Sequence, residues 1–76
     1  DEKCVFAKMK TNVGSAPGKT TCQMVRLIEE NFSYVAEPVF GKSGLMSSLT
    51  SANGYTLIDM NKEGLQKDEL VKVFLI

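Results

Sequence analysis

The sequence predicts a small all-β domain. Its 76 residues leave room for one domain, which we assign to residues 1–76. Short apolar segments rich in Val, Ile, Leu and Thr recur at a spacing of roughly ten residues, as in small all-β folds. The stretches between them are dense in residues that form turns. Because a chain of this length buries only about 60% of its unfolded surface, we also expect a surface that docks on a partner.

The first half of the chain predicts three strands. Residues 4–9 alternate apolar side chains with lysines, which is typical of a half-buried strand. Residues 11–18 (Thr-Asn-Val-Gly-Ser-Ala-Pro-Gly) predict a loop, and residues 20–28 predict a second strand. A polar turn over residues 29–33 leads to a third strand over residues 34–40, in which a proline marks an edge or a bend.

One short helix is expected after the third strand. Ser43 is a good N-cap, and the Asn-Gly pair at residues 53–54 is a good C-terminal stop signal. Between them Leu45, Leu49 and Ala52 recur at i, i+4 and i+7, which predicts an amphipathic helix of about two turns.

The last third of the chain predicts two more strands. Residues 55–60 and 70–76 are apolar, the second run being interrupted by Lys72. Residues 61–69 between them are polar and contain Gly64, so we expect a connecting loop there.

Composition argues against several classes of function. Lysine and arginine total 9, as do aspartate and glutamate, and Arg26 is the single arginine, so a nucleic-acid-binding face is not expected. The sequence has no histidine and no paired-cysteine motif, which argues against a metal site. No apolar run approaches 18 residues, so we expect no membrane partner. The chain opens at Asp1 without an initiator Met, and we interpret it as a fragment or a processed chain.

Two cysteines, Cys4 and Cys22, leave two alternatives. If the first two strands paired as a hairpin centred near Val13, the two thiols would face each other and a disulfide would be conceivable. The favoured alternative is a pair of small buried thiols in a reducing compartment.

A glycine-rich stretch at residues 14–20 is similar to a phosphate-binding loop. A P-loop needs four residues between its glycines, whereas Gly14 and Gly18 are separated by three. It also needs a helix after the Lys-Thr pair, whereas the residues from Thr20 onward predict a strand. We therefore interpret the stretch as a turn at Pro17 and Gly18, with Lys19 in solvent.

The start of the predicted helix is the better anion-binding candidate. Free backbone N–H groups and the helix dipole favour anions at a helix N-terminus, and Lys42, Ser43, Ser47 and Ser48 add donors. Ser48 lies at the margin of the apolar stripe, where its hydroxyl would be half buried. The competing interpretation, favoured from composition alone, is that these serines cap the helix or bond backbone carbonyls.

Several stretches resemble the C-terminal domain of the MoeA/gephyrin family, the molybdopterin molybdenumtransferases. The most specific is the Ser-Gly-Leu-x-Ser-Ser-Leu-x-x-Ala-Asn-Gly run at residues 43–54. The others are Pro-Gly-Lys-Thr at 17–20 with Val-Arg-Leu at 25–27, Val-Ala-Glu-Pro at 35–38, and Glu-Gly-Leu at 63–65 with valines at 71 and 73. The likeness covers about the last sixty residues.

The resemblance implies a bent β-ribbon that closes into a partial barrel, called a β-clip. It also implies a cytoplasmic, homodimeric parent enzyme in molybdenum cofactor biosynthesis. That enzyme takes molybdate and adenylylated molybdopterin, uses magnesium and inserts molybdenum. The C-terminal domain would line the active-site cleft beside the remaining domains. The isolated domain would be inactive and would bind none of these ligands by itself.

Carried over by position, the resemblance implies a set of oxyanion-binding residues. The turn cation of the family is Lys19, and its helix-start serine is Ser48 with Ser43 close by. Lys42, Ser47 and Asn53 would support them. The sequence departs from the family pattern because Lys19 replaces an arginine and Met24 replaces a second one, and lysine lacks the bidentate geometry of arginine.

Three functional hypotheses follow. The leading one is an enzyme module that completes the insertase cleft. The alternative is a structural or protein-interaction module that stabilises the parent dimer or docks a partner through an exposed strand face, for example at Tyr55 or Phe40. A small barrel that binds nucleic acid is the weakest, because the net charge is zero.

Overall fold

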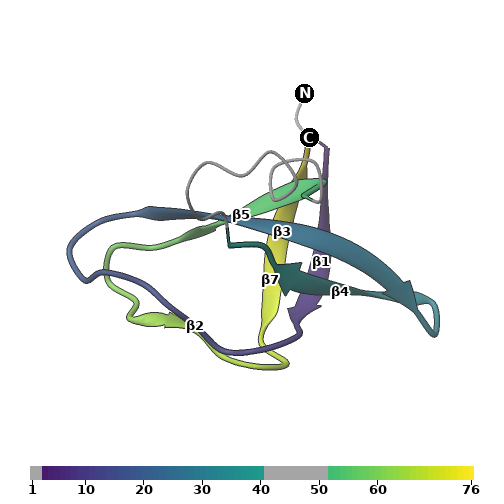
Figure 1. Ribbon diagram of the computed structural model, residues 1–76, viewed down its shortest axis with the longest axis horizontal. Coiled ribbons are helices and arrows are strands. Elements are labelled where there is room, and N and C mark those ends of the chain that lie inside the picture. The colour runs from purple at the N-terminus through teal and green to yellow at the C-terminus, as the bar shows by residue number, and fades with distance from the viewer. Residues whose placement is uncertain (1–2, 41–51) are drawn as a thin grey trace.

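Alternating apolar and polar residues build a strand-only fold in the described part of the chain. The computed structural model describes residues 3–40 and 52–76. Within them lie β1 (Cys4–Met9), β2 (Val13–Gly14), β3 (Thr21–Glu30), β4 (Ser33–Pro38), β5 (Gly54–Ile58), β6 (Gly64–Leu65) and β7 (Leu70–Leu75). Five strands close into a barrel in the order β1-β4-β3-β5-β7, and β2 pairs with β6 in a separate small sheet (Figure 1). The predicted all-β fold class is confirmed.

The barrel interior is filled by one apolar cluster. Because side chains alternate across a strand, every second residue points inward. Ala7 and Met9 come from β1, and Val71 and Val73 come from the facing part of β7. Val13 and Leu65 lie opposite each other in the small sheet and belong to the same cluster, so this sheet packs on the core. The remaining members are Val25, Ala36 and Ile58.

The pairing of β1 differs from the predicted hairpin. β1 pairs antiparallel with β7 and parallel with β4, and it has no register with β3. Cys4 therefore lies opposite Phe74, and Cys22 lies opposite Leu57. Both cysteines are free and exposed, so neither the disulfide nor the buried-thiol interpretation is correct. The reason is the long connection over residues 10–20, part of which forms β2, whereas a β-hairpin loop usually has two to five residues.

The strand boundaries agree closely with the sequence pattern. β1 has the predicted ends, β3 and β4 are shifted by a few residues, and β7 stops at Leu75. The two-residue strands β2 and β6 were expected to be loops, because a period of two cannot be recognised in two residues. The predicted helix falls almost wholly on residues 41–51, outside the described residues.

A two-residue turn joins β3 to β4. Glu30 pairs with Ser33, and the two central residues, Asn31 and Phe32, have φ angles of 49° and 68°. Positive φ at both central positions is the type I′ geometry, which suits the twist of a hairpin and favours Gly at the second position. Phe32 is fully exposed, so its side chain gains nothing from burial that would offset the left-handed backbone.

Replacing Phe32 with glycine should stabilise the chain by about 0.5–1 kcal/mol. The left-handed conformation costs a non-glycine residue about 1–2 kcal/mol, and glycine avoids this cost. Glycine also loses more conformational entropy on folding, which reduces the net gain by about 0.5–1 kcal/mol. Urea unfolding measures the difference. Phe32→Ala is the control, because it removes the ring but keeps the Cβ atom, and it should leave stability nearly unchanged. An equal gain in both variants would mean that the ring, and not the backbone angle, carries the strain.

Candidate functional site

A row of polar side chains crosses the outside of the barrel at the end of β4 and the start of β5. Arg26 on β3 is its centre, and Glu37 lies directly opposite on β4. On the β5 side of β3, Asn53 binds the backbone of the residues before and after Arg26. Its backbone N–H donates to the Val25 carbonyl at 3.1 Å, and its Oδ1 accepts from the Leu27 N–H at 2.8 Å. The side-chain amide of Asn53 thus continues the β3–β5 ladder past Gly54.

One carboxylate in this row is shared by two cations. Arg26 donates from Nη2 and Nε to Oε1 of Glu37 at 2.8 and 3.2 Å, and Lys10 donates to Oε2 at 3.3 Å. The hydrogen bonds from Arg26, and then those from Lys10, lower the pKa of Glu37 below its usual value. Two positive charges and one negative charge leave a net charge of +1. We call Lys10, Glu37, Arg26 and Asn53 the Arg26 row.

The Arg26 row lies beside the described residues that flank residues 41–51 in the sequence. On the N-terminal flank, the Val39 N–H donates to the Met24 carbonyl at 2.9 Å, and Gln23 donates to the Val39 carbonyl at 3.3 Å. On the C-terminal flank, Asn53 makes its two bonds to β3. Both ends of the segment are therefore fixed to the same stretch of β3. The predicted site residues Lys42, Ser43, Ser47 and Ser48 lie in this segment, outside the described residues.

Lys19 lies at the other end of β3. It is exposed and follows the predicted turn at Pro17 and Gly18, where Gly18 has a φ of 84° and donates to the Met60 carbonyl at 3.1 Å. Thr21, just after it, pairs with the last residue of β5. Five strand residues, about 17 Å, separate Thr21 from Arg26. The structure therefore does not bring Lys19 to Asn53. It does confirm the solvent-exposed turn, and a strand follows it where a P-loop would have a helix.

Met24, which stands where the family pattern has an arginine, is on the outer side of β3. It lies opposite Tyr55 and is half-buried. Its neighbours in the alternation, Gln23 and Val25, are buried and point inward. An arginine here would lie two residues before Arg26 on the same outer side of β3, in the row that also contains Tyr55.

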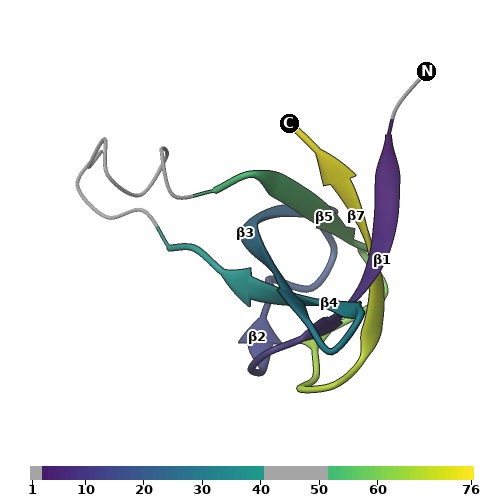
Figure 2. The same ribbon diagram turned by 90° about the vertical axis from the view of Figure 1, so that its right-hand side faces the viewer.

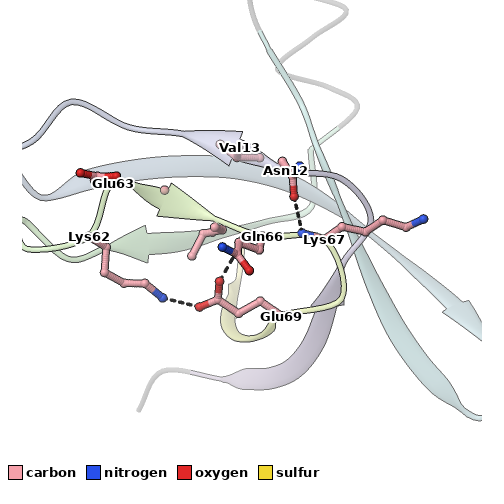
Figure 3. A pocket seen from close by; sticks show the side chains of 9 residues that line it. Asn12, Val13, Lys62, Glu63, Gln66, Lys67 and Glu69 are labelled. Atoms are coloured by element: carbon pink, nitrogen blue, oxygen red, sulfur yellow. Dashed lines mark hydrogen bonds and ion pairs between the residues drawn. The ribbon is translucent and has the colours of Figure 1, made fainter.

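A hollow of about 660 Å³ lies beside the small sheet (Figure 3). Several of its polar groups are bound to one another. Asn12 Oδ1 accepts from the Lys67 N–H at 2.7 Å, and Glu69 accepts from the Gln66 N–H at 2.9 Å and from the Lys62 ammonium. The bond from Lys62, followed by that from Gln66, lowers the pKa of Glu69. These contacts hold the loop before β7 in place, and we interpret the hollow as a structural feature.

The described residues offer no obvious place for a metal ion. In residues 3–40 and 52–76, no three His, Cys, Asp or Glu side chains come together as ligands. The same part of the chain has no helix with the length and apolarity needed to cross a membrane.

Arg26 is the residue that the sequence analysis did not single out as functional. The signal was present, because it is the single arginine and lies inside a stretch that resembles the family. Its place beside Asn53 depends on the β3–β5 register, which the sequence does not encode locally.

Comparisons with known proteins agree on one family. Residues 7–76 match the MoeA C-terminal region, domain IV. A protein of Methanocaldococcus jannaschii that is named for molybdopterin biosynthesis is 36% identical over 77 aligned positions, which cover 100% of this chain and 18% of that protein. The chain therefore spans about a fifth of the length of this curated relative.

Solved structures show the same likeness. The molybdopterin biosynthesis moeA protein of Pyrococcus horikoshii superposes with a TM-score of 0.84 at 29% identity, over 99% of this chain and 19% of that one. A molybdenum cofactor biosynthesis protein of Pyrococcus furiosus superposes with a TM-score of 0.78 at 25% identity, over 99% of this chain and 26% of that one.

Removing Arg26 should raise the pKa of Glu37 toward its usual value. The pKa of Glu37 is depressed in the folded chain. The stabilisation that its ionised carboxylate gains from Arg26 and Lys10 is therefore fully present above the unfolded pKa, near 4.5, and is lost as the pH falls through the lower folded value. A carboxyl-carbon NMR titration of Arg26→Ala measures the change. Lys10→Ala should raise the pKa less, because the Arg26 hydrogen bonds are the larger cause. A larger rise in Lys10→Ala would contradict this assignment.

Asn53→Ala should destabilise the chain by about 1 kcal/mol. It deprives the Leu27 N–H of its acceptor, and a typical hydrogen bond contributes about 0.5–1.5 kcal/mol. Asn53→Asp keeps an oxygen at this position and should retain most of the stability. Denaturant unfolding compares the three proteins, and equal losses in Ala and Asp would show that the bond to Leu27 contributes little.

Proposed function

The chain belongs to the MoeA family as its C-terminal region, domain IV, and from this premise we propose that it is the C-terminal module of a molybdenum insertase. The parent would be a cytoplasmic homodimer that transfers molybdate to adenylylated molybdopterin. In this proposal the domain lines one wall of the active-site cleft, and the remaining domains of the parent complete it.

The observation that carries the proposal is the position of the Arg26 row at the root of residues 41–51. The row has a net positive charge, and half of the Arg26 side chain is exposed, at 51%. The Oδ1 of Asn53 accepts from the Leu27 N–H, so the remaining polar group of this side chain is its NH₂ donor. Charge-assisted hydrogen bonds from a guanidinium are the strong and directional ones for an oxyanion. Arg26 and Asn53 therefore supply donors that suit an oxyanion such as molybdate.

Ser43 and Ser48 are the other proposed oxyanion ligands, with Lys42 and Ser47 in support. They belong to the segment whose two ends are fixed beside Arg26, which favours joint action with the row. Lys19 precedes Thr21, which itself lies about 17 Å from Arg26 along β3. We assign it to a separate anionic group of the substrate, such as a phosphate of adenylylated molybdopterin.

Magnesium does not fit the described residues, because no set of three candidate ligands gathers there. In the proposal the ion is held by other domains of the parent. The residues of this chain bind and orient the oxyanion, and the isolated domain is expected to be inactive.

A second function, as an interaction module, is favoured by one observation. Phe6, Leu57 and Leu70 are large apolar residues exposed on neighbouring strands, at 60%, 51% and 62%. Apolar side chains that gather on a surface mark a contact with another protein surface. The two functions are compatible, since they use different sides of the barrel.

Arg26→Ala and Ser48→Ala in the full-length parent should weaken molybdate transfer. Loss of a charge-assisted hydrogen bond of about 1.5–3 kcal/mol predicts an increase of about tenfold or more in the KM for molybdate for Arg26→Ala. Transfer is measured as molybdopterin metallation over a range of molybdate concentrations. Thermal unfolding of each variant separates this effect from lost stability.

Lys67→Ala is the matched control, because Lys67 is also an exposed cation but lies on the loop before β7, whose hydrogen bonds go to Met9 and Asn12 rather than to Arg26 or Asn53. It should leave the KM unchanged. Wild-type kinetics in both Arg26→Ala and Ser48→Ala, or an equal defect in the control, would contradict a ligand role for this side of the domain.

A further inference from the structure

The outer side of β5, β7 and β1 carries a largely apolar face that is interrupted by Lys8 and Lys72. The register places Tyr55, Phe74 and Cys4 in one row across the three strands. In the next row Phe6 lies opposite Lys72, and below it Leu70 lies opposite Lys8. Figure 2 shows the three strands side by side, with both chain ends above them. We call Cys4, Phe6, Tyr55, Leu57, Leu70 and Phe74 the β5–β7–β1 face.

Aromatic rings form the centre of this face. Tyr55 and Phe74 stack with ring centroids 5.3 Å apart, and the Lys72 ammonium stands 5.5 Å from the centroid of Phe74. The face continues onto β3, where Met24 lies opposite Tyr55 and Cys22 lies opposite Leu57. Rigid aromatic side chains that are flanked by a cation are typical anchors of protein interfaces.

A hollow in the face follows from the short pairing of β5 with β7. These strands pair only at Gly54 with Leu75 and at Tyr55 with Phe74. Beyond this point a hollow of about 340 Å³ opens between them, with Leu57, Leu70 and Phe74 among its apolar lining residues and Lys62, Glu69 and Lys72 among its charged ones. The Thr56 hydroxyl donates to the Lys72 carbonyl at 2.8 Å and is the bridge across its floor.

Two exposed thiols lie on the same surface. Cys4 is opposite Phe74, and Cys22 is opposite Leu57. Both are free and exposed in this chain. Cysteine is among the residues most often fully buried in proteins, so two exposed thiols on one apolar face indicate that the face is covered in the intact protein.

We infer that the β5–β7–β1 face is the surface on which this domain docks against a neighbouring domain of the same polypeptide. This inference rests on the proposed function only in placing the chain at the C-terminal end of a longer protein. The relatives indicate the size of the rest of such a protein, since this chain covers only 18–26% of their lengths.

The path of the chain identifies the occupant. β1 begins at Cys4, on the face itself, and the Leu75 N–H donates to the Lys3 carbonyl at 2.9 Å, so the two ends of the domain lie together at its edge (Figure 1). A domain that precedes Cys4 in the polypeptide is therefore tethered at the margin of the apolar face. Tethering over a short span gives an effective concentration of about the millimolar order, which favours this domain over free partners.

The charges of the face indicate the chemistry of the docked surface. Lys72 stands in the middle and Lys8 stands beside Leu70, whereas Asp59 lies at the rim of the hollow. Lys62 and Glu69, which also line the hollow, neutralise each other as an ion pair, so Lys72 and Lys8 exceed Asp59, and the covering surface should be apolar with carboxylates at its edge. In this arrangement Arg26, Glu37 and Asn53, which lie on β3, on β4 and just before β5, stay free to face the cleft.

Thiol alkylation of the full-length parent tests the inference. Iodoacetamide is added to the native and the urea-unfolded protein, and the rates at Cys4 and Cys22 are read separately by peptide mass spectrometry. A covered face predicts rates at both thiols that are at least about tenfold slower in the native protein. Similar rates in both states would overturn the inference.

A variant pair keeps the result specific. Leu57→Glu places a charge at the hollow of the face and should restore the reactivity of Cys4 and Cys22. Phe32→Glu introduces the same charge at the exposed β3–β4 turn and should not. Thiol protection that survives Leu57→Glu would overturn docking by the same polypeptide. Protection that disappears on dilution would overturn it as well and would indicate a second copy of the chain as the occupant. Thiol protection does not depend on molybdate chemistry. The docking inference can therefore hold while the insertase proposal fails, and the insertase proposal can hold while the docking inference fails.

Discussion

The hydrogen-bonding of β3 along both of its edges is the constraint on which the rest of the molecule depends. β3 pairs with β4 from Val25 to Glu30 and with β5 from Thr21 to Val25. The two ladders meet at Val25, which is fully buried. Because one strand is shared, the end of β4 and the start of β5 are held at the same level of the barrel. This brings Glu37, Arg26 and Asn53 together and fixes both ends of residues 41–51 beside them.

The same register separates two kinds of surface around the barrel. On β4 and β3 the outward residues include Glu37 and Arg26, which are charged and paired. On β5, β7 and β1 they include Leu57, Phe74 and Phe6, which are apolar. Close packing between β5 and β7 is possible because Gly54 has no side chain, since a Cβ atom there would lie 2.7 Å from Val73 Cγ1 and 2.9 Å from the Phe74 carbonyl oxygen. The polar side supports ligand binding, and the apolar side supports docking.

Local pattern was sufficient to predict the strands but not their partners. The alternation in residues 4–9 identified β1 with its observed ends, and the Val- and Ile-rich runs identified β3 and β7. Pairing depends on contacts between residues far apart in sequence, so the hairpin predicted from Cys4 and Cys22 was wrong. The same limit applies to the candidate site. Asn53 could be selected from the family resemblance, whereas Arg26 acquires its place only through the β3 register, and Lys19 lies at the far end of that strand.

Hydrogen exchange of the full-length parent, with and without molybdate and adenylylated molybdopterin, tests the central claim most directly. That claim is that ligand binds at the end of the barrel where β3 holds the Arg26 row. We predict slower exchange on peptides that cover residues 24–29 and 37–55 when ligand is present, and unchanged exchange on peptides that cover residues 60–70. Protection confined to residues 60–70, or no protection anywhere in the domain, would contradict it.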